Sequence, residues 1–306
     1  MNLARRSVAI LHGGLGNQLF QFAAALGITE FSDAGQVRLV SYGSEWGPAH
    51  PDVTSLAGIP VEYPNRFMRS TLPGVAVHES WKDSVSVLLS RMWGSLASVR
   101  LIHQDDPFAG RIEITSGTKE VVLDGFFQHR DWWLDSWQQV ARIIDSHRPE
   151  GVDAIRAEGR TAVKLRRSDY LGRGIVLPDD YYLNALELLD VRDCEVVVVC
   201  EEADYVAHFA TILAKRGCIA IAPERITGNA NVDDFWNLAA ARRQVLANSS
   251  YCWWAAAVAE VAGSAASVAD LAAVTYPTPW LPNAWSTGPM PDMGIPGWVA
   301  VPTGFE

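Results

Sequence analysis

Residues 7–18 read SVAILHGGLGNQ, and this stretch decides the first part of the fold. Its apolar beginning, residues 7–11, is typical of a strand buried in a parallel sheet. Three glycines follow, and after them apolar residues recur at helical spacing, at Leu15, Leu19, Phe22 and Leu26. The stretch therefore predicts a strand, a glycine loop and a helix.

Further apolar runs on either side extend this pattern along the chain. Residues 37–40 and 121–123 predict more strands of the same sheet, and residues 132–147 predict a helix. The breakers at 148–151 then predict a domain boundary. Beyond it, strands predicted at 162–165, 195–200, 218–222 and 244–247 alternate with helices that begin at Asp179 and Glu202 or span 235–243 and 251–262.

Alternating strands and helices predict an α/β fold built on doubly wound parallel sheets. We expect an N-terminal domain over 1–150 and a C-terminal domain over 151–306. The tail from Tyr276 onward carries several prolines, so we expect it to lack regular elements and to pack back over the domains.

Bulk composition narrows the class of protein. The 306 residues are 49% hydrophobic, which is enough for two packed cores. A net charge of -10 argues against nucleic acid or an anionic membrane as the partner. Four cysteines without a C-x-x-C pair favour a reduced, cytoplasmic protein. Peripheral attachment of such a protein to the inner face of the membrane is left open. No transmembrane span is predicted, because Glu260, Ser264 and Asp270 interrupt the Ala-rich segment 251–274.

The glycine loop is the first candidate site. Gly13, Gly14 and Gly16 would let backbone N–H groups approach an anion at a helix start, although a tight turn alone explains them equally well. A dinucleotide fingerprint would need glycine where Leu19 stands and an acidic residue where Ser41 stands. A nicotinamide-dependent dehydrogenase is therefore disfavoured.

The second candidate site is the basic segment 164–170, KLRRSDY, at the end of a predicted strand. Ligands of parallel sheets bind at that edge. Arg166 and Arg167 could form bidentate hydrogen bonds to phosphate, with Asp169 holding one guanidinium in position. A surface salt bridge is the structural alternative.

Two further segments offer polar groups near helix starts. Asn248, Ser249 and Ser250 follow a predicted strand and open a helix, so they could meet a ligand or simply cap that helix. Asp233 and Asp234 are expected before another helix, as caps or as acceptors for a guanine ring. No spacing of acidic residues, cysteines or histidines predicts a metal site.

Together and in order, these segments resemble the α-1,2-fucosyltransferases of glycosyltransferase family 11. The matching residues lie in both halves of the chain, at 13–22, 125–128, 166–170, 180–182 and 248–256. The resemblance implies two Rossmann-like domains facing a cleft, the GT-B arrangement. It also implies that L-fucose is transferred from GDP-fucose to a galactoside hydroxyl with inversion, giving an α-1,2 linkage without a divalent metal or other cofactor.

The resemblance also implies roles for individual residues. Arg166 would engage the donor diphosphate and Asp169 would support its loop. The remaining donor-binding residues would be Gly14, Gly16, Asn17, Gln18, Arg167, Asp234, Asn248, Ser249 and Ser250. The N-terminal domain would face the acceptor, a galactose-terminated oligosaccharide or glycolipid, with acceptor contacts expected in the loops of residues 42–118.

The sequence departs from the family pattern at Lys164, where histidine is usual, and at Ser168, where glycine is usual. A protonated lysine is a poor base, so another nucleotide sugar or a catalytically silent binding module stays an alternative. The general base is open, and the candidates that flank predicted strand ends are His12, Asp124, His129 and Asp131.

Overall fold

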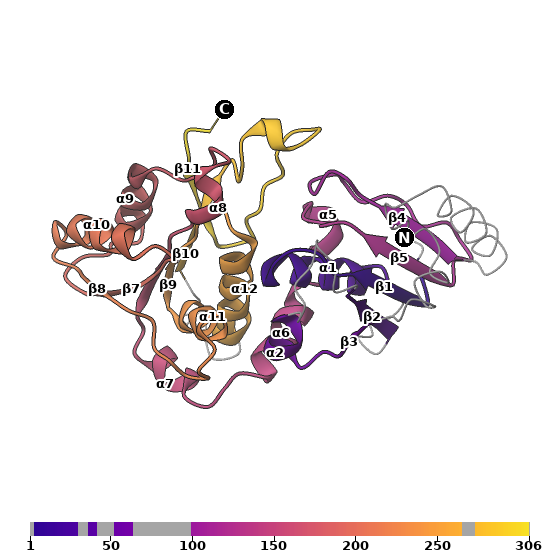
Figure 1. Cartoon of the computed structure of the whole chain (residues 1–306), viewed down its shortest axis with the longest axis horizontal. Helices are drawn as coiled ribbons and strands as arrows, with labels where there is room; N and C mark the ends of the chain where they lie inside the picture. The colour runs from indigo at the N-terminus through magenta and orange to yellow at the C-terminus, as the bar shows by residue number, and fades with distance from the viewer. Residues whose placement is uncertain (1–2, 30–35, 42–51, 64–98, 265–272, 306) are drawn as a thin grey trace. The chain divides into compact units, whose positions relative to one another are not determined.

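A computed structural model describes residues 3–29, 36–41, 52–63, 99–264 and 273–305. The chain forms two compact units, Met1–Val140 and Ala141–Glu306 (Figure 1). The division falls inside a helix, earlier in the chain than the boundary predicted at 148–151. Much of the predicted acceptor region, 42–118, lies outside the described residues.

The N-terminal unit is built on a parallel sheet with β1 at its centre. Its strands, in sheet order, are β3 (Val61–Glu62), β2 (Val37–Val40), β1 (Arg6–Ile10), β5 (Glu120–Asp124) and β4 (Val99–His103). Its helices are α1 (Leu15–Gly27), α2 (Asp52–Ala57) and α5 (Arg130–Trp133), and α6 (Trp137–Ser146) leads into the second unit.

The core of this unit explains why its first elements form. Val8 and Val122, on neighbouring strands, are fully buried and pack in one hydrophobic cluster. Gly14 stands before α1, and the four residues whose spacing predicted the helix are buried there: Leu15, Leu19, Phe22 and Leu26. The predicted strand, glycine loop and helix are therefore confirmed.

The C-terminal unit is built on a second parallel sheet. Its strands, in sheet order, are β11 (Val299–Pro302), β10 (Ala273–Thr278), β9 (Arg243–Val245), β6 (Thr161–Lys164), β7 (Glu195–Val199) and β8 (Ile219–Ile221). Its helices are α7 (Val152–Ala157), α8 (Ser168–Leu171), α9 (Asp179–Leu188), α10 (Ala203–Ala214), α11 (Ala230–Ala240), α12 (Ser250–Ser264) and the 3₁₀ turn η4 (Asn283–Trp285). The prediction of an α/β fold with parallel sheets is confirmed.

The prediction that the tail lacks regular elements is wrong. Residues from Tyr276 onward contribute to β10 and to β11, which extend the sheet beyond β9. Pro277 is tolerated because the pairing with β9 ends at Thr275, so the missing N–H faces no second neighbour. The tail also packs on its own unit, where the indole of Trp253 donates to the carbonyl of Met293 at 2.7 Å.

Other differences concern helix boundaries and two further strands that were not predicted. The helix predicted at 132–147 is two helices, α5 and α6. The helix predicted at 235–243 begins at Ala230, because the side chain of Asn229 accepts from two N–H groups of its first turn. β3 and β4 were not predicted, because both are short and stand in a stretch otherwise rich in turn residues.

Candidate functional site

The basic segment 164–170 begins on the last residue of β6, at the carboxyl edge of the second sheet. Lys164 is buried, with 5% of its side chain exposed, and its ammonium donates to Glu201 Oε1 at 2.9 Å. Glu201 lies just beyond β7, the neighbouring parallel strand. Burial acts to raise the pKa of Glu201, but the charges of Lys164 and Arg166 outweigh it and lower the pKa. The lysine is therefore an ion-pair partner inside the unit.

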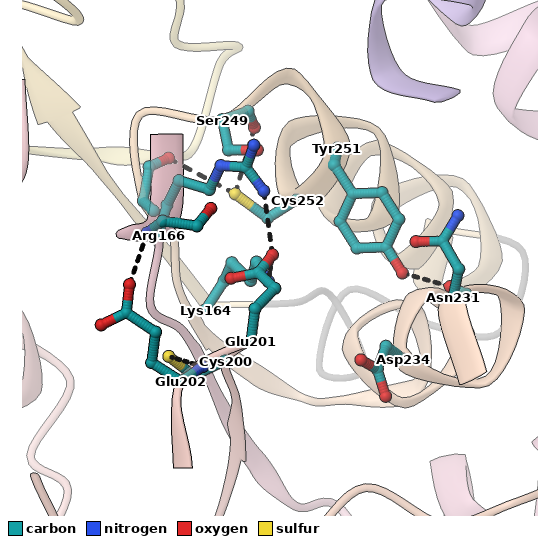
Figure 2. Close-up of polar contacts among 12 residues, drawn as sticks. Lys164, Arg166, Cys200, Glu201, Glu202, Asn231, Asp234, Ser249, Tyr251 and Cys252 are labelled. Carbon is teal, nitrogen blue, oxygen red and sulfur yellow. Dashed lines mark hydrogen bonds and ion pairs between the residues drawn. The ribbon is translucent and has the colours of Figure 1, made fainter. Parts of the chain in front are cut away.

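Arg166 is held by two carboxylates at this edge. Its Nη1 donates to the same Glu201 oxygen at 2.9 Å (Figure 2). Its Nη2 donates to Asp169 Oδ1 at 2.6 Å. Its Nε is buried and has no hydrogen-bond partner among the described residues. A guanidinium has five N–H donors, so these two bonds orient the group and leave donors for a ligand. The predicted support of Arg166 by Asp169 is present in the geometry.

Arg167 has a different environment from Arg166. It lies over the ring of Tyr205, 3.8 Å from the centroid, and donates from Nε to Glu202 at 3.2 Å. Glu202 also accepts from the backbone N–H of Ser168 at 2.7 Å. Ser168 has a positive φ of 22°, which is why glycine suits this position. Arg167 thus anchors the loop to α10.

The segment 248–250 lies close to the basic segment, because it follows β9, which pairs with β6. The hydroxyl of Tyr170 donates to the carbonyl of Asn248 at 3.0 Å, and the guanidinium of Arg166 lies 5.0 Å from the centroid of the Tyr170 ring. Burial raises the pKa of Tyr170 to about 12, so this hydroxyl stays a donor. Ser249 and Ser250 stand at the start of α12, and Figure 2 shows Ser249 and Arg166 on the same side of the cluster.

Asn248 carries an unused acceptor at this edge. Its Nδ2 donates to the carbonyl of Ile175 at 2.9 Å, whereas its buried Oδ1 has no hydrogen-bond partner among the described residues. Its side-chain amide is buried. A buried polar atom of this kind usually has a partner, which makes Oδ1 a candidate contact for a bound molecule.

Asp233 and Asp234 do not precede their helix, so the predicted capping role is wrong. Both lie in the first turns of α11, which Asn229 caps. Asp233 is buried and accepts from the N–H and the hydroxyl of Thr227, and Asp234 pairs with Arg225 at 2.8 Å. Asp234 therefore belongs to the surface between α11 and the loop before it.

The glycine loop of the N-terminal unit carries amides in place of cations. Gly13 has a φ of +68°, and a side chain there would meet the amide of Asn17 at 2.6 Å. The Oδ1 of Asn17 accepts from Gln128 at 2.7 Å, and Gln18 is buried and donates to the carbonyl of Gly13 at 3.0 Å. Gly14 is open to solvent on its Cβ side, and Gly16 is buried inside α1.

The sequence prediction missed the partners that position these groups. In the C-terminal unit, Glu201 and Glu202 pair with the basic segment. In the N-terminal unit, the side chain of Gln21 links the loops after β1 and β5: it accepts from the N–H of His12 at 3.0 Å and donates to the carbonyl of Gly125 at 3.0 Å. The position of the glutamates directly after the strand predicted at 195–200 could have indicated them, because the carboxyl ends of parallel strands meet at one edge. The role of Gln21 had no such signal.

The four candidate bases separate into two pairs. His129 caps α5 by accepting from the N–H of Asp131 at 3.2 Å. His12 and Asp124 are joined by a 2.7 Å hydrogen bond between Nε2 and Oδ1. Among the described residues no group of three or more histidine, cysteine, aspartate or glutamate side chains is arranged to hold a metal ion. None of the helices in this part of the chain has the length and hydrophobicity of a membrane span.

Comparison with known proteins gives one curated relative and several solved structures. No family model matches the chain. The relative is an α-1,2-colitosyltransferase from Escherichia coli, 24% identical over 295 residues, which span 89% of this chain and 91% of that protein.

The similar structures have TM-scores below 0.5. Fucosyltransferase NodZ from Bradyrhizobium is 15% identical over 82% of this chain and 92% of that chain, with a TM-score of 0.46. Arabidopsis thaliana FUT1 in complex with GDP is 11% identical over 84% of this chain and 69% of that chain, with a TM-score of 0.46. E. coli heptosyltransferase WaaC with ADP is 13% identical over 97% of this chain and 93% of that chain, with a TM-score of 0.40.

Proposed function

We propose that this protein is an inverting glycosyltransferase that moves L-fucose from GDP-β-L-fucose to the 2-hydroxyl of a galactoside. The observation that carries the proposal is the group formed by Arg166, Asn248 and the start of α12 at one sheet edge. This group presents guanidinium donors, backbone N–H groups and a helix N-terminus, which together suit a diphosphate.

The chemistry follows from where charge develops. The acceptor oxygen attacks the anomeric carbon from the face opposite GDP, so a β-linked donor gives an α-linked product. As the bond to GDP breaks, negative charge grows on the β-phosphate, and Arg166 with the helix start would stabilise that charge more strongly than the ground state. We further propose that these groups replace a divalent ion, so that transfer persists in the presence of a chelator.

The cations of the basic segment are balanced by neighbouring carboxylates, which affects how a donor would bind. Lys164, Arg166 and Arg167 are matched by the three carboxylates Glu201, Glu202 and Asp169. The cations are therefore oriented before a ligand arrives, which lowers the entropy cost of binding a dianion. The same pairing explains how a buried lysine is accommodated where the family has histidine.

A second donor is favoured by one specific observation, the 24% identical relative that is named a colitosyltransferase. Colitose is L-fucose without its 3-hydroxyl, so GDP-colitose would differ from GDP-fucose at one sugar position only. Discrimination between them would lie in contacts to that hydroxyl, because a site that hydrogen-bonds a hydroxyl strongly rejects the analogue that lacks it.

The experiment is a donor panel with the purified full-length protein. GDP-fucose, GDP-colitose, GDP-mannose and ADP-heptose are each incubated with a panel of β-galactosides, with and without a chelator, and products are analysed for linkage. We expect α-1,2-fucosyl or α-1,2-colitosyl galactosides in both conditions. Transfer from ADP-heptose alone, or GDP binding without transfer or donor hydrolysis, would overturn the proposal.

A further inference from the structure

Four titratable side chains form a continuous hydrogen-bonded chain at the carboxyl edge of the N-terminal sheet. His12 Nε2 lies 2.7 Å from Asp124 Oδ1, and Asp124 Oδ2 lies 2.9 Å from His103 Nδ1. His103 Nε2 in turn lies 3.0 Å from Asp105 Oδ1. The chain follows from strand order, because Asp124 on β5 stands in register with Ile10 on β1 and with His103 on β4.

The protonation states follow from these contacts. Burial acts to raise the pKa of Asp124, but hydrogen bonds and charge from His12 and His103 outweigh it and lower the pKa. An ionised Asp124 accepts from both rings, so His12 carries its proton on Nε2 when neutral. His103 faces a carboxylate with each nitrogen; burial acts to lower its pKa, but Asp124 and Asp105 outweigh it and raise the pKa.

The free atom of this chain is His12 Nδ1. It has no hydrogen-bond partner among the described residues, and 27% of the His12 side chain is exposed. The groups that face His12 are Asp124 from β5, the amide of Gln21 from α1 and the ring of Phe126 after β5. A neutral imidazole held by a carboxylate, with its second nitrogen open, is the arrangement of a general base.

We infer that His12 is the general base that deprotonates the acceptor hydroxyl, with Asp124 and His103 as positioning residues. This inference rests on the proposed function. The O–H bond of the acceptor breaks and its proton passes to Nδ1, while the oxygen electron pair forms the bond to the anomeric carbon. The electron pair of the broken glycosyl–phosphate bond leaves with GDP, and the His12 proton is later released to water.

His103 adjusts the strength of this base. Its positive charge competes with His12 for Asp124, so it limits how strongly Asp124 stabilises a protonated His12. His103 is 54% exposed, so its influence is screened by solvent. Replacement of His103 by neutral glutamine removes that competing charge and should therefore move the acid limb of the rate profile to higher pH.

The main test is His12→Gln, because the glutamine amide can still donate to Asp124 but has no basic nitrogen to accept a proton. We expect kcat for transfer to fall by ~100-fold or more, with loss of the acid limb of kcat/KM and with the Kd for GDP unchanged. His129→Asn is the matched control, because asparagine also caps α5. It should keep the wild-type rate and pH profile.

Two outcomes would overturn the inference. One is a His12→Gln variant that keeps at least a third of the wild-type kcat and the same acid limb. The other is an unchanged acid limb in His103→Gln, where an upward shift of a few tenths of a pH unit is expected; this exposed position also decides the case if His12→Gln does not fold. Failure of the wild-type protein to transfer any sugar would instead contradict the proposed function.

Discussion

The two sheets of this protein have the same parallel architecture and different chemistry at their carboxyl edges. In the C-terminal unit that edge carries Lys164, Arg166 and Arg167, each paired with a carboxylate. In the N-terminal unit the loops after β1 and β5 carry imidazole, amide and carboxylate groups. Guanidinium donors suit a diphosphate, and an edge of imidazole, amide and carboxylate groups suits sugar hydroxyls. The comparison indicates that the parallel sheet provides an edge where ligands can bind, whereas the residues of the loops at that edge determine which ligand chemistry it suits.

The largest expected effect breaks the cationic edge. Arg166→Ala should lower GDP-fucose turnover by at least ~100-fold, because a preorganised donor to the leaving phosphate is lost. Arg166→Lys should recover only part of the rate, since lysine cannot bond in a bidentate manner. Steady-state kinetics with Arg192→Ala as the control checks this, because Arg192 is an exposed ion-pair residue on the same unit. Near-normal turnover by Arg166→Ala would contradict the assigned role.

The next prediction concerns how charge pairing at the C-terminal edge contributes to stability. Glu201→Ala leaves the buried Lys164 without its carboxylate and should lower the free energy of unfolding by about 2 kcal/mol, a value discounted because Glu201 is itself 41% exposed. Lys164→Met should change it by less than about 1 kcal/mol, because an apolar chain fills the same space. Urea unfolding of both variants measures the contrast. Equal losses in the two variants would show that the ion pair, and not the buried charge, dominates.

A smaller effect tests the glycine loop of the N-terminal edge. Gly13→Ala should destabilise the protein by about 1–2 kcal/mol, because φ is positive and the new Cβ would press on Asn17. Gly14→Ala should leave stability within about 0.5 kcal/mol, since φ is ordinary there and no atom lies within 4 Å of the added Cβ. Thermal unfolding compares the two variants. If Gly14→Ala alone weakened activity, the open side of the loop would be identified as a ligand contact.

The smallest expected effect is the pH dependence of stability that arises at the N-terminal edge. The raised pKa of His103 means that its contribution to stability is complete below about pH 6.5 and is lost as the pH rises through the folded pKa. The lowered pKa of Asp124 means that its contribution is present above about pH 4 and is lost as the pH falls through the folded pKa. Stability from this pair is therefore greatest between these limits.

Urea midpoints at about pH 6 and about pH 8.5 check this expectation. The wild type should lose less than about 1 kcal/mol between them through His103, because the ring is more than half exposed. His103→Gln should remove that part of the loss. A variant whose midpoint falls as much as that of the wild type would show that other groups cause the pH dependence.

The correct and incorrect sequence predictions differ in the range of the interactions involved. Strands such as β1 and β7 and the helix α1 were predicted because their pattern is local and repeats within a few residues. Helix α11 begins at Ala230, five residues before the predicted start at Phe235, because Asn229 caps it. β10 was missed because its tolerance for Pro277 depends on where the pairing with β9 ends.

The candidate site shows the same division. Arg166 and the segment 248–250 could be expected together, because both follow strands of one parallel sheet and such strands end at one edge. The contact between the Arg167 guanidinium and the Tyr205 ring could not be predicted, since Tyr205 lies on another helix, α10. The chain from His12 to Asp105 needs three strands in register.

The amino-acid sequence by itself determined the alternation of strands and helices, the glycine loop and the position of the basic segment, because each depends on neighbours along the chain. Only the tertiary structure decided which carboxylate meets each cation and which histidine meets Asp124. Those pairings join residues as far apart as His12 and Asp124, and they form only when strand pairing within a sheet brings separate strand ends to one edge.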